Sequence, residues 1–190
     1  MLKVLKKIYP EPKYSNYENL NYDTEGLYSI THPLDANKIS ETILKYSNKS
    51  SFIIDLTAGC GGNLISFGKY FDNVFGLEID NLRFKILFKN INCYNYNIKI
   101  KNDNCINYLD KKFDIYFIDP PWGGPEYKSN NNLKLYLSNI ELKDILSKIL
   151  KKKIVVLKLP YNYNYQYIIN NYVILEEQTY NNIKILYINT

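Results

Sequence analysis

The residues best suited to chemistry form one short stretch, residues 119–125, with the sequence DPPWGGP. It follows an apolar run, residues 113–118, which predicts a buried strand. Two consecutive prolines end a strand and leave no N–H between them, so the carbonyls of Asp119 and Pro120 are presented beyond the strand end, beside the Asp119 carboxylate. Ligands bind at the carboxyl ends of strands in an open α/β sheet. With the indole ring of Trp122, these acceptors predict a site that holds a flat group bearing an amine.

Acidic residues are also expected at the ends of three further strands. The strands and their acids are residues 51–56 with Asp55, residues 74–78 with Glu78, and residues 97–101 with Asp103. An acid after the second strand is placed to bind ribose hydroxyls, and Asp103 is placed to accept a hydrogen bond from an adenine amino group. For Asp103, the N-cap of a helix near residues 105–109 is an equally good interpretation. Three strand-end acids suit a ligand that contains a nucleoside.

A glycine-rich turn, residues 57–63 with the sequence TAGCGGN, separates the first of these strands from a helix expected at residues 64–70. The order strand, glycine loop, helix lets a ligand approach the backbone closely at the helix N-terminus. The turn matches neither the dinucleotide-binding GxGxxG pattern nor the P-loop pattern, so its spacing does not indicate phosphate binding. Glycine turns are common in α/β proteins, so this turn indicates ligand binding only in combination with the strand-end acids.

Strands and helices are predicted to alternate along most of the chain. Further helices are expected at 34–46, 80–90 and 133–150, the last after a polar loop at 129–132, and further strands at 154–159, 172–176 and 183–188. Asn181 and Asn182 form a hairpin-type turn between the last two strands. This order predicts an α/β, Rossmann-like fold with a doubly wound, mostly parallel seven-stranded sheet and an antiparallel C-terminal strand.

The domain organisation is predicted to be simple. Residues 31–190 form one domain, and residues 1–30 form an N-terminal arm or lid that helps to cover the substrate and donor site. Before Asp23 the segment is polar, rich in tyrosine and broken by two prolines, so we expect little regular structure there. A flexible tail is the alternative interpretation.

Composition limits the class of protein. The chain has 190 residues, 46% of them hydrophobic, and a formal net charge of +5, which suits one globular domain and is compatible with an anionic partner. No apolar run approaches the ~20 residues that span a membrane. The three cysteines fit no zinc pattern, and the single histidine gives little scope for metal or triad chemistry. We therefore expect an intracellular monomer with reduced cysteines, no metal and no membrane contact.

The strand-end residues together suggest methyl transfer to an amine. An exocyclic amine on a base is a poor nucleophile, because its lone pair is delocalised into the ring. Hydrogen bonds to the Asp119 carboxylate and the Pro120 carbonyl would hold it beside an electrophile, while Trp122 stacks on the ring. The charged sulfonium of S-adenosylmethionine is attacked directly, so neither a strong base nor a metal is required.

Residues 119–127, DPPWGGPEY, closely resemble the signature of the trimethylguanosine synthase family, the RNA cap guanine-N2 methyltransferases. The shorter motif alone resembles S-adenosylmethionine-dependent amino methyltransferases in general, whose acceptors include adenine, cytosine, guanine and glutamine amines. Further similarities are Glu25 to Thr31, the GGN of residues 61–63, Leu159-Pro160 and Asn181-Asn182. The resemblance implies an S-adenosylmethionine-dependent class I methyltransferase domain over residues 31–190.

The resemblance also assigns roles to residues of this chain. For the methyl donor, S-adenosylmethionine, it implies contacts from Thr31, Asp55, Gly59, Asn63, Glu78 and Asp103. For catalysis it implies Asp119, Pro120 and Trp122. Trp122 would stack on the positively charged ring of 7-methylguanine, a cation–π contact of ~0.5–2 kcal/mol. The resemblance also implies that Tyr127 reaches the cap triphosphate. Lys158 and Lys184 are candidates to supply charge there in place of the family's basic residues, and a solvated surface lysine is the alternative interpretation of each.

The chain departs from the family pattern at several positions. The family often has serine at the position of Asp119, tryptophan at that of Leu27, and basic residues at those of Asn21 and Tyr161. The implied reaction is transfer to N2 of 7-methylguanosine-capped RNA or a cap nucleotide, giving 2,7-dimethyl- and, after a second transfer, 2,2,7-trimethylguanosine caps. The location would be the nucleus for a cellular protein and the host cytoplasm for a viral one. Another nucleic-acid amino methyltransferase and a catalytically silent cap- or RNA-binding module are the alternatives.

Overall fold

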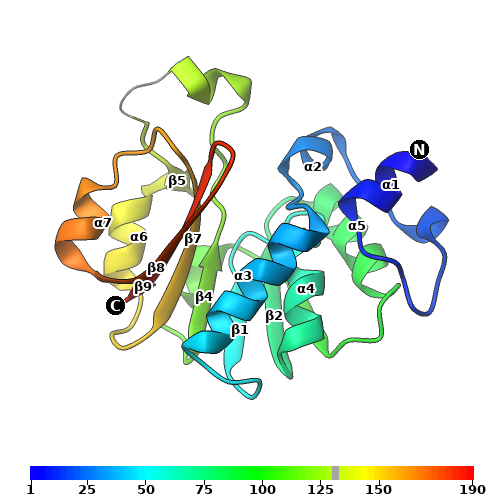
Figure 1. The fold of residues 1–190 in the computed structure, drawn as a ribbon, viewed down its shortest axis with the longest axis horizontal. Coiled ribbons are helices and arrows are strands. Elements are labelled where there is room, and N and C mark those ends of the chain that lie inside the picture. Colours follow the sequence, from blue (N-terminus) through cyan, green and yellow to red (C-terminus); the bar gives the residue numbers. More distant parts are fainter. Residues whose placement is uncertain (130–132) are drawn as a thin grey trace. The chain divides into compact units, whose positions relative to one another are not determined.

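The computed structural model describes residues 1–129 and 133–190 (Figure 1). It divides into two compact units, Met1–Asp103 and Asn104–Thr190, which are taken in turn. Within the described residues, no helix is both long and apolar enough to cross a membrane.

The first unit contains three parallel strands in the order β3-β2-β1, with bounds β1 (Phe52–Asp55), β2 (Asn73–Glu78) and β3 (Ile98–Asn102). Helices α3 (Pro33–Lys45), α4 (Gly62–Tyr70) and α5 (Asn81–Ile91) alternate with them (Figure 1). Gly76 of β2 lets α4 approach closely, because a Cβ there would lie 2.5 Å from a methyl carbon of Leu64. Parallel strands bring their carboxyl ends to one edge, where Asp55 and Glu78 lie.

The N-terminal segment is more regular than its sequence predicts. It forms α1 (Leu2–Ile8), a 3-10 helix (Tyr17–Asn19) and α2 (Thr24–Ser29). The expectation of little regular structure before Asp23 is wrong, because Leu5 and Ile8 give α1 a buried face at helical spacing. The two prolines interrupt only the stretch between the helices.

Two caps define the helices at the end of this segment. Asp23 is the N-cap of α2, with its carboxylate accepting from the N–H of Gly26. His32 is the N-cap of α3, with its Nδ1 accepting from the N–H of Leu34, because Pro33 fixes the first helical position.

The second unit contains four strands in the order β4-β7-β9-β8. Their bounds are β4 (Ile115–Ile118), β7 (Ile154–Pro160), β8 (Val173–Tyr180) and β9 (Ile183–Asn189). β4 and β7 are parallel, whereas β9 is antiparallel to both of its neighbours. All four residues of β4 are buried, which explains its continuous apolar sequence. With the three strands of the first unit, these complete the seven-stranded α/β arrangement predicted from the sequence, including its antiparallel C-terminal strand.

The helix predicted at residues 133–150 is wrong in its first half. A short hairpin, β5 (Tyr136–Leu137) with β6 (Ile140–Glu141), precedes α6 (Leu142–Lys148). The turn residues Ser138 and Asn139 have φ of 48° and 65°, which a helix does not allow. The polar loop predicted at 129–132 lies, beyond Ser129, outside the described residues. The other elements of this unit are two 3-10 helices, Cys105–Tyr108 and Pro125–Ser129, and α7 (Gln166–Asn171).

Candidate active site

All six residues predicted to contact the methyl donor lie in the first unit, and all six predicted for catalysis and substrate lie in the second. In the first unit, Asp55 ends β1, Glu78 ends β2 and Asp103 follows β3. Thr31 precedes α3, while Gly59 and Asn63 belong to the glycine loop and the first turn of α4.

Glu78 is buried, and backbone N–H groups hold both of its carboxylate oxygens. Oε2 accepts from the N–H of Gly59 at 3.0 Å, and Oε1 accepts from that of Asp80 at 2.8 Å. Burial raises the pKa of Glu78, against the opposing effects of these two N–H groups and the Arg83 guanidinium. Each carboxylate oxygen can accept more than one hydrogen bond, so Glu78 can both fix the glycine loop and receive ribose hydroxyls.

Asp55 sets the beginning of the same loop. It is almost fully buried, and its Oδ1 accepts from the N–H of Thr57 at 2.9 Å. The loop then turns through Gly59 and Gly61, whose φ values of 55° and 102° favour glycine. Gly61 is the N-cap of α4, so the loop delivers the chain directly into the helix.

Asn63 offers a buried acceptor. Its Nδ2 donates to Thr31 Oγ1 at 3.0 Å, and both residues are only 9% exposed. The Oδ1 of Asn63 is buried and has no hydrogen-bond partner among the described residues. An unmet buried acceptor costs about 1–3 kcal/mol, and native proteins seldom leave one. The residues present therefore fit a ligand that brings an N–H donor, such as the ammonium of a methionyl group, to this position.

Asp103 does not cap a helix. Asn104 is the N-cap of the 3-10 helix Cys105–Tyr108, and its Oδ1 accepts from the N–H of Ile106 at 3.1 Å. Asp103 instead pairs with Lys101, with 2.8 Å between the carboxylate and ammonium. The capping interpretation of Asp103 is wrong, and its role at the adenine stays a prediction.

Buried hydrogen bonds join the N-terminal segment to the glycine loop. The sequence analysis did not predict these contacts. The fully buried Asn90 of α5 donates through Nδ2 to the carbonyl of Cys60 at 2.8 Å, to Tyr9 Oη at 2.8 Å and to the carbonyl of Asn21 at 2.9 Å. Its Oδ1 accepts from the N–H of Asn21 at 2.8 Å. The only signal in the sequence is an asparagine three positions after the buried Leu87, on the inward face of its helix.

A second contact on this segment is ionic. Arg83 of α5 binds Asp23 through Nε at 2.9 Å and Glu25 through Nη2 at 2.5 Å. Burial disfavours the charged form of Asp23, but the N–H of Gly26 and the guanidinium outweigh it and lower the pKa of Asp23. α2 is thereby attached to α5, the helix that follows Glu78 at the end of β2.

The second unit gathers the predicted catalytic residues around the end of β4. Asp119 and the buried Pro120 follow the strand directly, and the half-buried Trp122 lies two positions further on. The rings of Trp122 and Tyr127 meet edge to face, with 5.1 Å between centroids. Trp122 Nε1 is buried and has no hydrogen-bond partner within the described residues. Gly123 and Gly124 follow with φ of 89° and 74°, so this turn requires glycine for its backbone.

Lys158, predicted near the cap triphosphate, pairs instead with Asp119. Its Nζ lies 2.6 Å from Asp119 Oδ2 and 5.9 Å from the centroid of the Trp122 ring. Burial raises the pKa of Asp119, and the Lys158 ammonium opposes that rise. Lys184 has a different setting, because its Nζ lies 2.7 Å from Glu177 and 4.5 Å from the centroid of the Tyr165 ring. The structure therefore places Lys158 with Asp119 and Trp122, and Lys184 with Glu177 and Tyr165.

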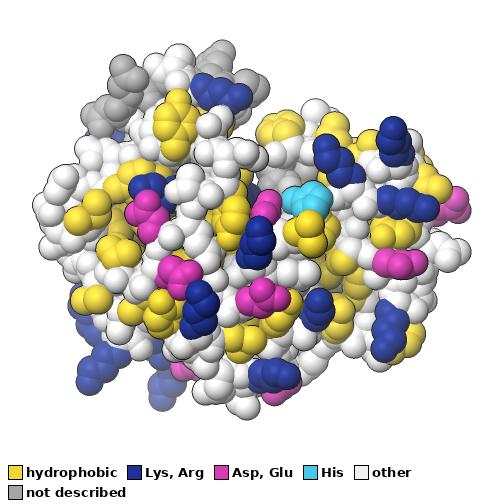
Figure 2. All heavy atoms as spheres, viewed as in Figure 1, with side chains coloured by type: hydrophobic (Ala, Val, Ile, Leu, Met, Phe, Trp, Pro, Cys, Tyr) yellow, Lys and Arg dark blue, Asp and Glu magenta, His cyan; other side chains and the backbone are white. Residues whose placement is uncertain are grey.

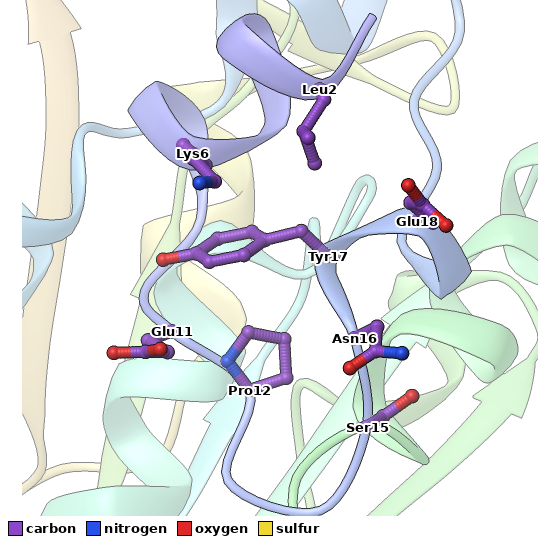
Figure 3. Close-up of a pocket in the computed structure, with 8 residues that line it drawn as sticks. All are labelled: Leu2, Lys6, Glu11, Pro12, Ser15, Asn16, Tyr17 and Glu18. Atoms are coloured by element: carbon purple, nitrogen blue, oxygen red, sulfur yellow. The ribbon is translucent and has the colours of Figure 1, made fainter.

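Other surface features do not coincide with these residues. A cavity of about 260 Å³, in which the Tyr17 ring lies between Lys6 and Pro12, is formed wholly by residues 2–18 (Figure 3). On the face shown in Figure 2, basic side chains are scattered among acidic ones and do not form one patch. Within the described part of the chain, no cluster of three or more His, Cys, Asp or Glu residues is arranged to hold a metal.

Comparison with known sequences identifies relatives over most of the chain. The RNA cap guanine-N2 methyltransferase family matches residues 50–190. An uncharacterized protein of Acanthamoeba polyphaga mimivirus is 32% identical over 86% of this chain and 76% of its own length. The trimethylguanosine synthases of Schizosaccharomyces pombe and Saccharomyces cerevisiae are 30% and 31% identical over 67% and 74% of this chain. The chain spans only 58% and 49% of the length of these two fungal proteins.

Solved structures show the same fold at low sequence identity. A Thermus thermophilus 16S rRNA N2 methyltransferase, in complex with AdoMet and guanosine, has a TM-score of 0.64 over 90% of this chain and 44% of its own, at 15% identity. A putative class I S-adenosylmethionine-dependent methyltransferase of Listeria monocytogenes has a TM-score of 0.61 over 90% of this chain and 62% of its own, at 11% identity. The class I methyltransferase fold predicted from the sequence is confirmed.

Proposed function

Because this chain belongs to the RNA cap guanine-N2 methyltransferase family, we propose that it transfers methyl groups from S-adenosylmethionine to the N2 amine of 7-methylguanosine caps. One observation carries the proposal. A carboxylate, a proline carbonyl and an indole ring stand together at the end of β4, as an amine on a flat base requires. The acceptor is capped RNA or a cap nucleotide, and the acting species is an intracellular monomer. It works in the nucleus if a cell encodes it and in the host cytoplasm if a virus does.

The donor is held by residues of the first unit. When bound, S-adenosylmethionine supplies a methyl group activated by a positively charged sulfur. Glu78 receives the ribose hydroxyls, Asp103 the adenine amino group, and the buried Oδ1 of Asn63 the ammonium. Thr31, Asp55 and Gly59 shape this pocket. Residues 1–30 border it as an arm, since Asn90 and Arg83 attach that segment to α5 and the glycine loop.

The acceptor base is held by residues of the second unit. Trp122 stacks on the 7-methylguanine ring, whose positive charge strengthens the contact with an electron-rich indole by ~0.5–2 kcal/mol. Asp119 and the Pro120 carbonyl accept the hydrogens of the N2 amine and fix its lone pair toward the methyl group. Tyr127 supports the indole edge to face and lies next to the cap triphosphate. No strong base is needed, because the nitrogen becomes acidic once it carries the methyl group.

The product identifies the function directly. The chain is incubated with labelled S-adenosylmethionine and, in parallel, with 7-methylguanosine triphosphate, GTP, uncapped RNA and DNA, and products are identified by mass. We expect label only in the 7-methylated nucleotide, as 2,7-dimethyl- and then 2,2,7-trimethylguanosine triphosphate. Transfer to uncapped RNA or DNA alone would overturn the cap assignment in favour of another amino methyltransferase. Cap binding without any transfer would overturn it in favour of a binding module, an alternative that the departures at Asn21, Leu27 and Tyr161 keep open.

A further inference from the structure

Two Asp–Lys pairs lie at opposite ends of the same two strands. The register that pairs Ile115 with Ile154 and Ile118 with Leu157 also sets Asp114 opposite Lys153 at one end. At the other end it sets Asp119 opposite Lys158, 39 positions along the chain. Each pair is therefore a direct product of strand register, and the two can be compared as site and control.

The two pairs differ in side-chain burial and in the distance between their charged atoms. At the active-site end, the Lys158 side chain is 5% exposed, that of Asp119 is 18% exposed, and their charged atoms are 2.6 Å apart. At the far end, the Lys153 side chain is 18% exposed, that of Asp114 is 51% exposed, and the distance is 3.7 Å. A charge this buried interacts strongly with its partner, whereas a pair reached by water is screened.

Lys158 also touches the second group that holds the base. Its ammonium lies 5.9 Å from the centroid of the Trp122 ring, within the range of a cation–π contact. The lysine of the neighbouring strand, Lys184 of β9, pairs with Glu177 of β8 at 2.7 Å. One cation thus contacts both the carboxylate and the indole.

We propose that Lys158 is a positioning residue for methyl transfer, which maintains the negative charge of Asp119 and fixes the plane of Trp122, and that it does not bind the cap phosphates. The inference rests on the proposed function. A triphosphate lies in water, but this ammonium is nearly inaccessible and already contacts a carboxylate. Lys158 therefore acts on the base through Asp119 and Trp122.

The role follows from the balance of charge during transfer. The amine nitrogen forms a bond to the methyl carbon, the carbon–sulfur bond breaks, and its electron pair remains on sulfur as a neutral thioether. The positive charge passes to the nitrogen, which then releases one proton to the Asp119 carboxylate or to water. Lys158 takes no part in the bond changes and holds the Asp119 carboxylate through the 2.6 Å contact.

The test is the pH–rate profile of methyl transfer in Lys158→Met, with Lys153→Met as the matched control. Without the ammonium, the buried Asp119 binds a proton more readily, so the acid limb of the profile moves to higher pH in Lys158→Met. The rate falls at least about tenfold at neutral pH and recovers on raising the pH, while Lys153→Met follows the wild type. A Lys158→Met profile that is lowered evenly at all pH values, or one matched by Lys153→Met, would overturn the proposal.

The double variant Asp119→Asn/Lys158→Met guards against a simple folding defect, because it removes both buried charges at once. The pH–rate profile of the double variant should lack the acid limb that Asp119 causes. Its rate of methyl transfer should be no lower than that of Asp119→Asn alone. Multiplied losses in the double variant would show that the two residues act independently. S-adenosylmethionine binding, which the first unit provides, is measured for every variant as the folding control.

A spectroscopic readout separates failure of this inference from failure of the proposed function. Trp122 is the only tryptophan of the chain, so tryptophan emission reports on this site without any turnover. The pH at which the Trp122 emission changes should be higher in Lys158→Met than in the wild type, whether or not the cap is the acceptor. Identical emission profiles in wild type and Lys158→Met would overturn the role of Lys158. Absence of cap methylation with shifted emission would instead count against the proposed function alone.

Discussion

The two units hold the acids predicted for the site with different kinds of hydrogen-bond donor. In the first unit, Glu78 and Asp55 are bound by backbone N–H groups of the glycine loop and its neighbours. In the second unit, the Asp119 carboxylate accepts from a side chain, the ammonium of Lys158, at 2.6 Å. Backbone donors remain when side chains change, whereas a side-chain partner can be lost by one substitution. The contacts of Glu78 and Asp55 in the first unit, the donor half, thus include backbone donors, and those of Asp119 in the second unit, the acceptor half, include a side-chain cation.

The strongest test of this contrast is removal of the side-chain-held acid. Asp119→Ala leaves the buried Lys158 without its carboxylate, which should lower the free energy of unfolding by about 3–5 kcal/mol. Asp114→Ala, at the other end of the strand, should cost less than about 1 kcal/mol because that pair is more exposed. Urea titration at neutral pH measures both. Equal losses would show that burial does not distinguish the two pairs.

Loss of the indole should affect the acceptor half only. Trp122→Ala should reduce cap methylation by about 30-fold or more, the effect of ~2 kcal/mol of lost stacking. Affinity for S-adenosylmethionine, measured by calorimetry, should stay unchanged. Trp122→Phe keeps an aromatic ring with a weaker quadrupole, so its rate of cap methylation should lie between those of the wild type and Trp122→Ala. Undiminished cap methylation in Trp122→Ala would refute the stacking role.

Loss of the buried asparagine should affect the donor half only. Asn90→Leu removes the contacts to Cys60, Tyr9 and Asn21, so the free energy of unfolding should fall by about 1–3 kcal/mol. Donor affinity should fall about tenfold as the glycine loop loosens. Asn97→Leu is the control, because its single bond to a carbonyl lies at the surface. Unaltered donor affinity in Asn90→Leu would mean that the N-terminal segment does not position the loop.

The donor half should also respond to acid in a predictable direction. Burial raises the pKa of Glu78, so its protonation begins at higher pH than for an ordinary glutamate. Ribose binding needs the ionised carboxylate, so donor affinity should weaken as the pH falls through that raised pKa. In Glu78→Gln the affinity should be lower by several-fold and lack this dependence. A dissociation constant that varies equally with pH in both proteins would assign the effect to another group.

The smallest effect is expected at Lys184. Its pair with Glu177 is partly exposed, so Lys184→Met should change the free energy of unfolding by less than about 1 kcal/mol. If Lys184 contacts the triphosphate, the KM for the cap nucleotide should rise a few-fold at constant kcat, whereas Lys158→Met should mainly lower kcat. A higher KM in Lys158→Met and a lower kcat in Lys184→Met would instead assign phosphate binding to Lys158 and positioning to Lys184.

The sequence predicted the local parts of both halves. Strand-end acids such as Glu78, the glycine loop and the turn after β4 are encoded by neighbouring residues, and they lie where the pattern placed them. What could not be predicted depends on distant partners. The contact of Lys158 with Asp119 needs the register of two strands 39 positions apart, and that of Asn90 with Tyr9 spans 81 positions. The β5–β6 hairpin was missed because its short apolar run also fits a helical period.

The buried Oδ1 of Asn63 has a consequence for how catalysis is limited. In the proposed placement it binds the ammonium of the donor, a group that methyl transfer leaves unchanged. An interaction that is equal before and after the reaction strengthens binding without lowering the barrier. It should hold S-adenosylhomocysteine as firmly as the donor itself. Turnover would then be subject to product inhibition, and its rate would depend on how quickly other enzymes remove the spent thioether.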